Sequence, residues 1–455
     1  MSLIRSGRSS VVVEDPPAEL LEGLRRFRRE GSGEGEYENL YSLSFDGKTM
    51  VTAPGFANRV RSLCPSVRFR NEKRAMPTPD KEAAMRGLDK FWEGVVFNAV
   101  DSGGGIVCIP DALGELDMTA AILRAFSHEA LLERGLPMSV VAVPDEEMAK
   151  AVMAKLQAVF PDRDIGRVSA RRYSDADDIL VATYSSLKNL SFQPVGVFIA
   201  CDLSGTDITP YVESISMIRE AARWGICSTP LGEVPEDDMT LEGLFGEVVA
   251  RAKYSEAVKA GAVVPITVCW LPAPEPSVFG RGPFELIEAK AMQDNARFCD
   301  LVAGIVQDVP SDIGVIVTTN RRAMSSRLAR RIRGLVIYDK KVPMAQRRAI
   351  RNDLMDGVIR RAVVSYEVPL ASSLGVMVLA SCGGRNIAAK RIPWRKKTKP
   401  GDRAFIVDFD HSWDLHNGRP GYLARNDEAR AARYHELGFR QMSLDSVDQL
   451  PFIGG

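Results

Sequence analysis

The stretch from Gly103 to Phe126, GGGIVCIPDALGELDMTAAILRAF, decides the fold that we expect for the chain. A glycine run precedes an apolar run of β type, Ile106 to Ile109, and a loop from Pro110 to Asp117 leads into an amphipathic segment, Met118 to Phe126. This order predicts a strand, a tight loop and a helix. Such units build α/β domains with parallel sheets.

The loop, PDALGELD, resembles the frame of a phosphate-binding P-loop but lacks its chemistry. The pattern G-x-x-x-x-G-K-[ST] needs a lysine for the phosphates and a hydroxyl for magnesium. Here Pro110 opens the loop, Gly114 takes the last glycine position, Glu115 replaces the lysine and Leu116 replaces the hydroxyl. A carboxylate about 4 Å from a phosphate adds electrostatic repulsion on the order of 4 kcal/mol at an effective dielectric constant of about 20. The stretch is either a nucleotide site that lost its chemistry or a unit that never bound phosphate.

Composition indicates an ordinary globular protein of two or three domains, with 455 residues of which 45% are hydrophobic and 26% charged. Seven cysteines occur singly, which favours reduced, buried thiols and a cytoplasmic location. Four histidines leave little material for a metal site, so we expect neither a metal nor a cofactor. No apolar run reaches the roughly 18 residues of a membrane span, and MSLIRSGRSS lacks the apolar core of a signal peptide.

A net charge of zero hides an uneven distribution. Residues 320–361 hold thirteen basic and three acidic side chains, a net of +10, and residues 385–403 hold eight and one, a net of +7. The candidate contacts in this basic half are Arg321, Arg322, Arg330, Lys396 and Lys397. They fit sequence-independent binding of DNA, or an acidic protein surface, including a second copy of this chain. The alternative is a solvated charged face.

Alternating helices and apolar strands predict two α/β domains in tandem after a small β-rich appendage. We expect an arm and linker over 1–36, a small domain over 37–76, α/β domains over 77–262 and 263–410, and an extension over 411–455. In the first half we expect helices at Ala18–Arg29, Phe56–Leu63, Glu146–Phe160 and Ile208–Ala222, a hairpin turn at Asp46-Gly47, and further strands at Met138–Val143, Asp178–Thr183, Gly196–Cys201 and Gly225–Cys227.

The second domain repeats this alternation without a visible sequence repeat. We expect strands at Val264–Trp270, Ile313–Thr318, Leu335–Tyr338, Arg361–Ser365, Val376–Ala380 and Arg403–Phe409, and helices at Glu285–Asp308, Arg321–Ile332, Pro343–Met355 and Asn426–Leu437.

Several stretches at the expected strand ends are similar to motifs of the superfamily 2 helicases. The stretches in the first domain are VVAVPDEEMA (140–149), VATYSSL (181–187), FIACDLS (198–204) and GICSTP (225–230). Those in the second are AQRR (345–348), SYEVPLASSL (365–374) and KPGDRAFIVDF (399–409). The resemblance runs from about residue 37 to residue 410, and it is closest to short phage-type and repair-type members. It implies two RecA-like domains.

The resemblance also implies which residues have replaced the catalytic ones. In the family an Asp orders Mg²⁺ and a Glu positions the attacking water. Here Cys201 and Asp202 stand at these places, and a thiol is a poor magnesium ligand. Arg391 and Arg395 lie in the arginine-finger region, but the glycine and the three-residue spacing of that motif are absent. No catalytic residue is therefore expected.

The motif that contains Thr183, Tyr184 and Ser185 carries hydroxyls that contact phosphates in the family. Asp145 and Glu146 instead place two carboxylates where the family has a threonine and a basic residue. We therefore expect a pseudoenzyme, a helicase fold kept as a structural or interaction component of a phage particle or a replication assembly. The alternative is a divergent but working ATP-dependent DNA translocase, whose phosphate lysine comes from elsewhere in the chain or from a partner.

Overall fold

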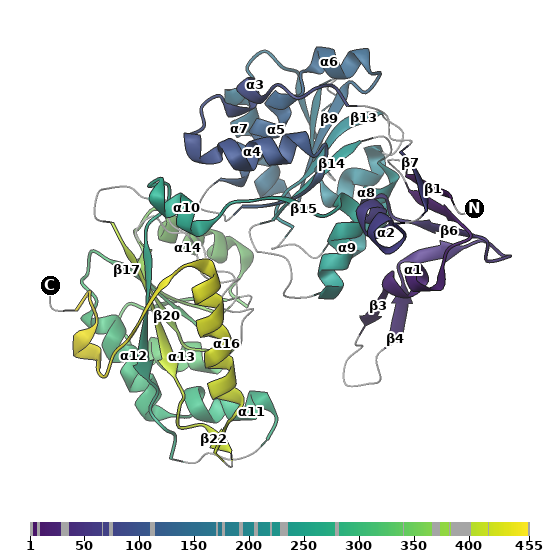
Figure 1. The fold of residues 1–455 in the computed structure, drawn as a ribbon. Helices are drawn as coiled ribbons and strands as arrows, with labels where there is room; N and C mark the ends of the chain where they lie inside the picture. The colour runs from purple at the N-terminus through teal and green to yellow at the C-terminus, as the bar shows by residue number, and fades with distance from the viewer. Residues whose placement is uncertain are drawn as a thin grey trace. The chain divides into compact units, whose positions relative to one another are not determined.

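The computed structural model describes residues 3–6, 10–28, 36–65, 67–71, 76–109, 114–169, 172–174, 178–190, 194–203, 208–218, 221–227, 235–277, 282–339, 341–365, 374–381, 383, 402–416 and 418–453. The chain divides into two compact units, Met1–Ala252 and Lys253–Gly455 (Figure 1). We expected the division after residue 262. In the described part of the chain, no helix is long and apolar enough to cross a membrane.

The first unit begins with a five-stranded sheet in the order β5-β6-β2-β1-β7. Its strands are β1 (Leu3–Ser6), β2 (Val11–Glu14), β5 (Tyr41–Leu43), β6 (Thr49–Thr52) and β7 (Arg68–Asn71). Only β1 and β7 pair in parallel. The expected turn at Asp46-Gly47 joins β5 to β6, and Gly47 adopts φ +70° there.

We expected a peripheral arm over residues 1–36. The described residues 3–6 and 11–14 instead form β1 and β2, which are inner strands of this sheet. The side chains of Ile4, Val11 and Val13 are fully buried in its core, so this segment is part of the small domain. The expected helix Ala18–Arg29 is also too long: α1 ends at Gly23, and the chain then forms a strand. The remaining elements here are α1 (Ala18–Gly23), β3 (Arg25–Arg28), β4 (Glu36–Asn39), a 3₁₀ turn (Pro54–Phe56) and α2 (Ala57–Leu63).

The rest of the first unit is an eight-stranded sheet in the order β11-β10-β12-β9-β13-β14-β8-β15, in which only β11 is antiparallel to its neighbour. Its strands are β8 (Gly105–Cys108), β9 (Met138–Val143), β10 (Ile165–Ser169), β11 (Arg172–Ser174), β12 (Ile179–Thr183), β13 (Val195–Ala200), β14 (Ala222–Cys227) and β15 (Val248–Arg251). Every residue of β8, β9, β12, β13 and β14 is buried, as expected where helices cover both faces of a parallel sheet.

The helices of this sheet are α3 (Lys81–Met85), α4 (Glu93–Asp101), α5 (Glu115–Ala125), α6 (His128–Glu133), α7 (Glu146–Val159), α8 (Val212–Met217) and α9 (Pro235–Phe245), with 3₁₀ segments at Lys90–Trp92, Tyr184–Leu190 and Thr209–Tyr211. The expected helix Ile208–Ala222 is wrong in length. Helix α8 ends at Met217, because the chain re-enters the sheet as β14 and buries Trp224 completely.

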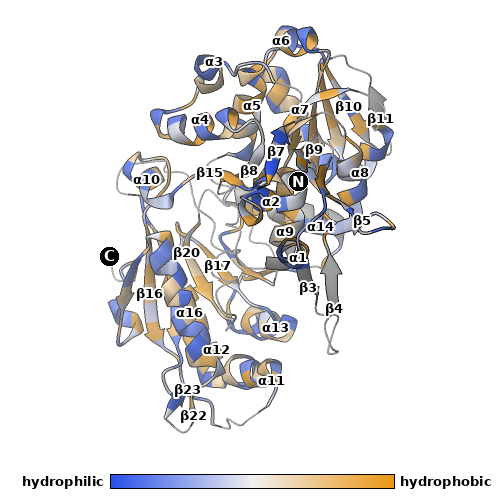
Figure 2. Ribbon diagram, turned by 45° about the vertical axis from the view of Figure 1, so that its right-hand side comes forward, coloured by the Kyte–Doolittle hydropathy of each residue, from blue (hydrophilic) through white to orange (hydrophobic). Residues whose placement is uncertain are grey.

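The second unit contains a seven-stranded parallel sheet in the order β18-β19-β17-β20-β21-β16-β24. The strands are β16 (Ile266–Pro272), β17 (Gly314–Thr318), β18 (Val336–Tyr338), β19 (Arg361–Val364), β20 (Leu374–Leu379), β21 (Ala404–Asp410) and β24 (Arg440–Ser443). Val315 and Val317 of β17 pack in the core on one face with α12 and α13, whereas Ile316 packs on the other with Ile350 and Leu354 of α14. Figure 2 shows central strands of both sheets as mainly hydrophobic.

The helices of the second unit are α10 (Tyr254–Lys259), α11 (Phe284–Glu288), α12 (Ala296–Asp308), α13 (Arg322–Arg331), α14 (Met344–Met355) and α16 (Tyr422–Leu437). A π turn lies at Ala289–Gln293 and a 3₁₀ turn at Val447–Gln449. A small hairpin joins β22 (Leu415–His416) to β23 (Arg419–Pro420). The expected single helix Glu285–Asp308 is interrupted. Asn295 caps α12 by accepting the N–H of Phe298, and its amide donates to the carbonyl of Pro274 at 2.6 Å.

Residues 411–455 are not an extension outside the second domain. Strand β24 adds to the sheet beside β16, and α16 begins at Tyr422, four residues earlier than expected. Two consecutive parallel sheets with helices on both faces, after a small β-rich domain, are the tandem RecA-like architecture that the sequence predicted.

Candidate functional site

The candidate site lies at the carboxyl ends of β8 and β13, where α5 begins. Gly114 precedes α5 with φ +94°, and a Cβ there would lie 2.5 Å from the Oδ2 atom of Asp117. Only glycine fits this position without strain. Pro110 lies in 110–113, outside the described residues. The structure thus places the glycine, and the helix it introduces, where the strand-loop-helix pattern predicted them.

Glu115 is the first residue of α5, and its carboxylate bridges to the loop after β13. Its Oε1 atom accepts the backbone N–H of Asp202 at 2.5 Å. Asp202 has φ +56°, a conformation that few residues other than glycine adopt. The positive end of α5 also favours a negative charge at this place. A side-chain carboxylate of the protein therefore lies at the helix start that a P-loop offers to a phosphate.

Cys201 stands beside this bridge and is fully buried. Its Sγ atom lies 3.5 Å from the hydroxyl of Thr119 on α5. Burial, with a further contribution from the charge of Glu115, holds the pKa of the Cys201 thiol well above its ordinary value. The thiol is protonated at neutral pH and is no ligand for magnesium. Among the described residues, no three His, Cys, Asp or Glu side chains are grouped so as to hold a metal.

Leu116, the residue at the hydroxyl position, is half-buried on α5. The hydroxyl that this helix does bring to the site belongs to Thr119, which donates to the carbonyl of Glu115 at 3.0 Å. Sequence comparison alone did not single out Thr119, because it lies one turn beyond the motif position. Lys155 of α7 reaches the same end of the helix, where it pairs with Asp117 at 2.7 Å.

Two of the three predicted phosphate contacts are enclosed in the domain. Tyr184 is fully buried, and its hydroxyl donates to the carbonyl of Cys201 at 2.6 Å. Burial raises the pKa of Tyr184 well above its ordinary value. Thr183 is also buried, with its hydroxyl 2.9 Å from that of Ser186. Only Ser185 is exposed. Of the three predicted contacts, Ser185 is the one whose hydroxyl a ligand in solvent can reach in this structure.

The two carboxylates after β9 have structural partners of their own. Asp145 is the N-cap of α7 and accepts the N–H groups of Glu147 and Met148 at 2.9 and 2.8 Å. Glu146 forms an ion pair with Arg167 of β10. Both residues thus help to fix the start of α7.

Carboxylates of the same unit pair with most of the arginines on and next to α13. The ion pairs are Arg321–Glu288 at 3.2 Å, Arg322–Asp339 at 3.6 Å, Arg327–Asp294 at 2.9 Å and Arg331–Asp300 at 2.8 Å. Arg330 differs: its guanidinium donates to the carbonyl of Ser326 at 3.3 Å, and no carboxylate in the described part of the chain pairs with it. Four arginines on and next to α13 are therefore neutralised within the unit, which the charge count could not reveal. Arg391, Arg395, Lys396 and Lys397 lie in 384–401, outside the described residues.

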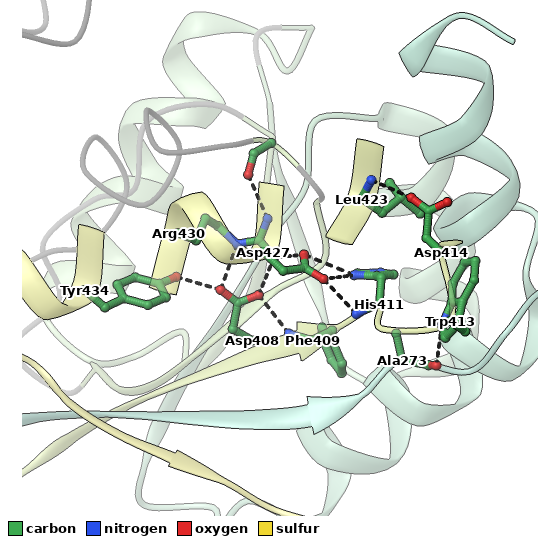
Figure 3. Close-up of polar contacts among 11 residues, drawn as sticks. Ala273, Asp408, Phe409, His411, Trp413, Asp414, Leu423, Asp427, Arg430 and Tyr434 are labelled. Carbon is green, nitrogen blue, oxygen red and sulfur yellow. Dashed lines mark hydrogen bonds and ion pairs between the residues drawn. The ribbon is translucent and has the colours of Figure 1, made fainter. Parts of the chain in front are cut away.

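A buried polar cluster in the second unit was not predicted. Arg430 of α16 donates to both carboxylate oxygens of Asp408 at 2.9 Å, to Asp427 at 2.8 Å and to the carbonyl of Gly383 at 2.8 Å (Figure 3). Tyr434 adds a hydrogen bond of 2.7 Å to Asp408, and the N–H of His411 donates to Asp427 at 2.7 Å. Burial alone would lower the pKa of Arg430, but the two carboxylates outweigh it and raise that pKa.

This cluster fixes α16 to the carboxyl end of β21. Four of its side chains, those of Asp408, His411, Arg430 and Tyr434, have no exposed surface. A buried arginine that satisfies two carboxylates is costly to disturb, because removing it leaves uncompensated charge in the core. The cluster is therefore a structural element of the second unit.

Known structures provide the comparison for this architecture. S. cerevisiae Dbp5 bound to RNA and ADP BeF3 is similar over 81% of this chain and 93% of its own, with 10% identity and a TM-score of 0.52. The DUF1998 helicase MrfA bound to DNA is similar over 83% of this chain and 54% of its own, with 12% identity and a TM-score of 0.52. T4 UvsW aligns over 98% of this chain and 99% of its own, with 13% identity and a TM-score of 0.42.

The likeness to Dbp5 and MrfA shows the fold of this chain, two RecA-like domains in tandem. No protein-family model and no curated protein matches the sequence.

Proposed function

We propose that this protein is a helicase-fold pseudoenzyme, a structural or interaction component that contacts nucleic acid without regard to sequence. One observation carries the proposal: the Glu115 carboxylate is bonded to the N–H of Asp202 at the helix start where a P-loop lysine would meet phosphate. A nucleotide would have to displace an anion that already holds the positive end of α5. The site would also offer the nucleotide no lysine for its phosphates and no carboxylate for magnesium.

Nucleic-acid contact is supported by the fold and by a few exposed groups. Dbp5 and MrfA, which share the fold, are bound to RNA and DNA in their structures. In this chain, Ser185 offers an exposed hydroxyl, and Arg330 is an exposed arginine that no carboxylate of the described chain neutralises. So few phosphate contacts predict weak binding with a shallow dependence on salt, because the salt slope scales with the number of phosphates that the protein neutralises.

Calorimetric titration with ATP and magnesium, with and without single-stranded DNA, tests the enzymatic part. We expect no saturable binding in the micromolar range and no hydrolysis. The variant Glu115→Lys should also show no turnover, because Cys201 still replaces the metal carboxylate. Micromolar ATP binding by the unaltered protein, followed by hydrolysis, would establish the divergent translocase instead.

Filter binding of single-stranded DNA at several salt concentrations tests the nucleic-acid part. If Arg330 contacts a phosphate, Arg330→Ala should lower the slope of log affinity against log salt by about one unit. Arg327→Ala is the matched control on the same helix, because Asp294 already neutralises Arg327. Undetectable binding by the unaltered protein at physiological salt would rule out the DNA contact and leave a purely protein-binding role.

A further inference from the structure

Two cysteines of the first unit lie side by side on neighbouring strands. Cys108 of β8 and Cys227 of β14 are direct partners in the parallel register, and their Sγ atoms are 3.4 Å apart. Both side chains belong to the same core cluster, so they project from the same face of the sheet. Their exposed fractions are only 3% and 1%. Two other buried thiols contact different groups: Cys201 lies 3.5 Å from the Thr119 hydroxyl, and Cys299 of α12 lies 3.7 Å from the Met324 sulfur.

We propose that Cys108 and Cys227 form a reversible disulfide, a redox modification site at the carboxyl ends of two central strands. The oxidant is a small peroxide such as hydrogen peroxide. One thiolate attacks the peroxide oxygen, which gives a sulfenic acid and releases water after proton uptake. The second thiol then attacks the sulfenic sulfur, and a second water leaves. Two thiols and one peroxide thus give one disulfide and two waters.

The strand geometry permits this bond. Neighbouring parallel strands lie about 4.8 Å apart, and in-register side chains leave them in the same direction. This spacing falls within the roughly 4.4 to 6.8 Å that separates the Cα atoms of disulfide-bonded cysteines. The Sγ atoms are 3.4 Å apart and need only approach each other to bonding distance. Dithiothreitol reverses such a link by thiol–disulfide exchange.

The position of the pair connects it to the candidate site. The chain passes from Cys108 through Ile109 into residue 110, and from Cys227 directly into residue 228. The N–H of Ile109 already donates to the carbonyl of Cys227 at 2.8 Å. A disulfide would add a covalent link between the strand that leads into the loop before α5 and the strand that contains the first half of the GICSTP stretch.

The reaction should be slow in the folded protein. The hydrogen bond to Cys108, together with burial, raises the pKa of the Cys227 thiol well above its ordinary value. Only a small fraction of the pair is then thiolate at neutral pH. A large disulfide such as oxidised glutathione would not reach these buried sulfurs, whereas hydrogen peroxide is little larger than water.

Peptide mapping of the full chain tests the proposal. The native protein is incubated with hydrogen peroxide, unfolded in N-ethylmaleimide and digested without reductant. We expect a peptide pair linked through Cys108 and Cys227, which dithiothreitol separates. Oxidation should also raise the thermal midpoint by several degrees, because the link closes a long loop in the unfolded chain. Recovery of both cysteines as maleimide adducts, or links that join them to other cysteines, would overturn the proposal.

Two variants make the assignment specific. Cys108→Ser should abolish both the linked peptide and the rise in thermal midpoint. Cys269→Ser is the matched control, because Cys269 is an equally buried strand cysteine in the second unit and should leave both results unchanged. If Cys108→Ser does not fold, Cys227→Ala serves in its place, and the peptide map of the unaltered chain decides the question without either variant.

Discussion

The carboxylate of Glu115 accepts the backbone N–H of Asp202 at 2.5 Å, and this contact ties the start of α5 to the loop after β13. Because the acceptor is a carboxylate, this is a charge-assisted hydrogen bond, which is stronger than one between neutral groups. Tyr184 holds this loop from the other side through the carbonyl of Cys201. The side chains of Glu115 and Tyr184 thus hold the backbone at Cys201 and Asp202 from two sides.

Removal of the Glu115 carboxylate should loosen that loop. Glu115→Ala leaves the Asp202 N–H without its acceptor, and we expect a loss of about 1 to 3 kcal/mol in the free energy of unfolding. Hydrogen exchange at the Asp202 amide should accelerate. Urea unfolding and exchange mass spectrometry measure the two effects. Glu115→Gln keeps an acceptor oxygen and should lose less than Ala; equal losses in both variants would show that this hydrogen bond does not stabilise the loop.

The buried cluster around Arg430 should be the most sensitive position in the second unit. Arg430→Met removes the partner of two buried carboxylates, and we expect destabilisation of about 3 to 5 kcal/mol. Arg425→Met, five residues earlier on α16, changes an exposed arginine that stacks on the Tyr422 ring, and it should cost no more than about 0.5 to 1 kcal/mol. Denaturant unfolding compares the two. Similar losses would mean that the cluster contributes little to stability.

The first unit should not tolerate a side chain at Gly55, where the small domain meets α9. A Cβ on Gly55 would lie 1.8 Å from the carbonyl oxygen of Glu242, so the backbones would have to separate. We expect Gly55→Ala to cost about 1 to 3 kcal/mol and to expose the small domain to proteolysis. Gly94→Ala on the exposed face of α4 is the control. It has open space around its Cβ position, so helix propensity should make it neutral or stabilising.

Alkaline pH should destabilise the second unit partly through Cys269. Burial raises the pKa of this thiol from 9.0 to about 11. Between these values the unfolded chain releases the thiol proton while the folded chain retains it, so the unfolded state binds fewer protons and stability falls as pH rises. The free energy of unfolding, measured across this pH range, should fall less steeply with pH for Cys269→Ala than for the unaltered protein. Equal pH slopes would exclude a raised pKa at this position.

The sequence by itself determined the α/β class, the tandem domains and most of the central strands. Short, mainly apolar runs rich in β-branched residues, such as Met138–Val143, are typical of strands buried on both faces, so pattern and length were enough to assign them. The replacements at Glu115, Leu116 and Cys201 could also be read directly, since a motif is defined by residue type and spacing. Element lengths were less certain: Glu285–Asp308 reads as one periodic helix because an interruption by Asn295 does not break the apolar pattern.

Only the tertiary structure decided which side chains are available for function. Tyr184 and Ser185 are adjacent in the sequence, yet one is fully buried against the loop of Cys201 and the other faces solvent. The arginines near α13 count as positive charge in the sequence, and their carboxylate partners lie up to 33 residues away. The contact between Glu115 and Asp202 joins residues 87 positions apart. Burial and pairing depend on distances across the fold, which local residue patterns do not encode.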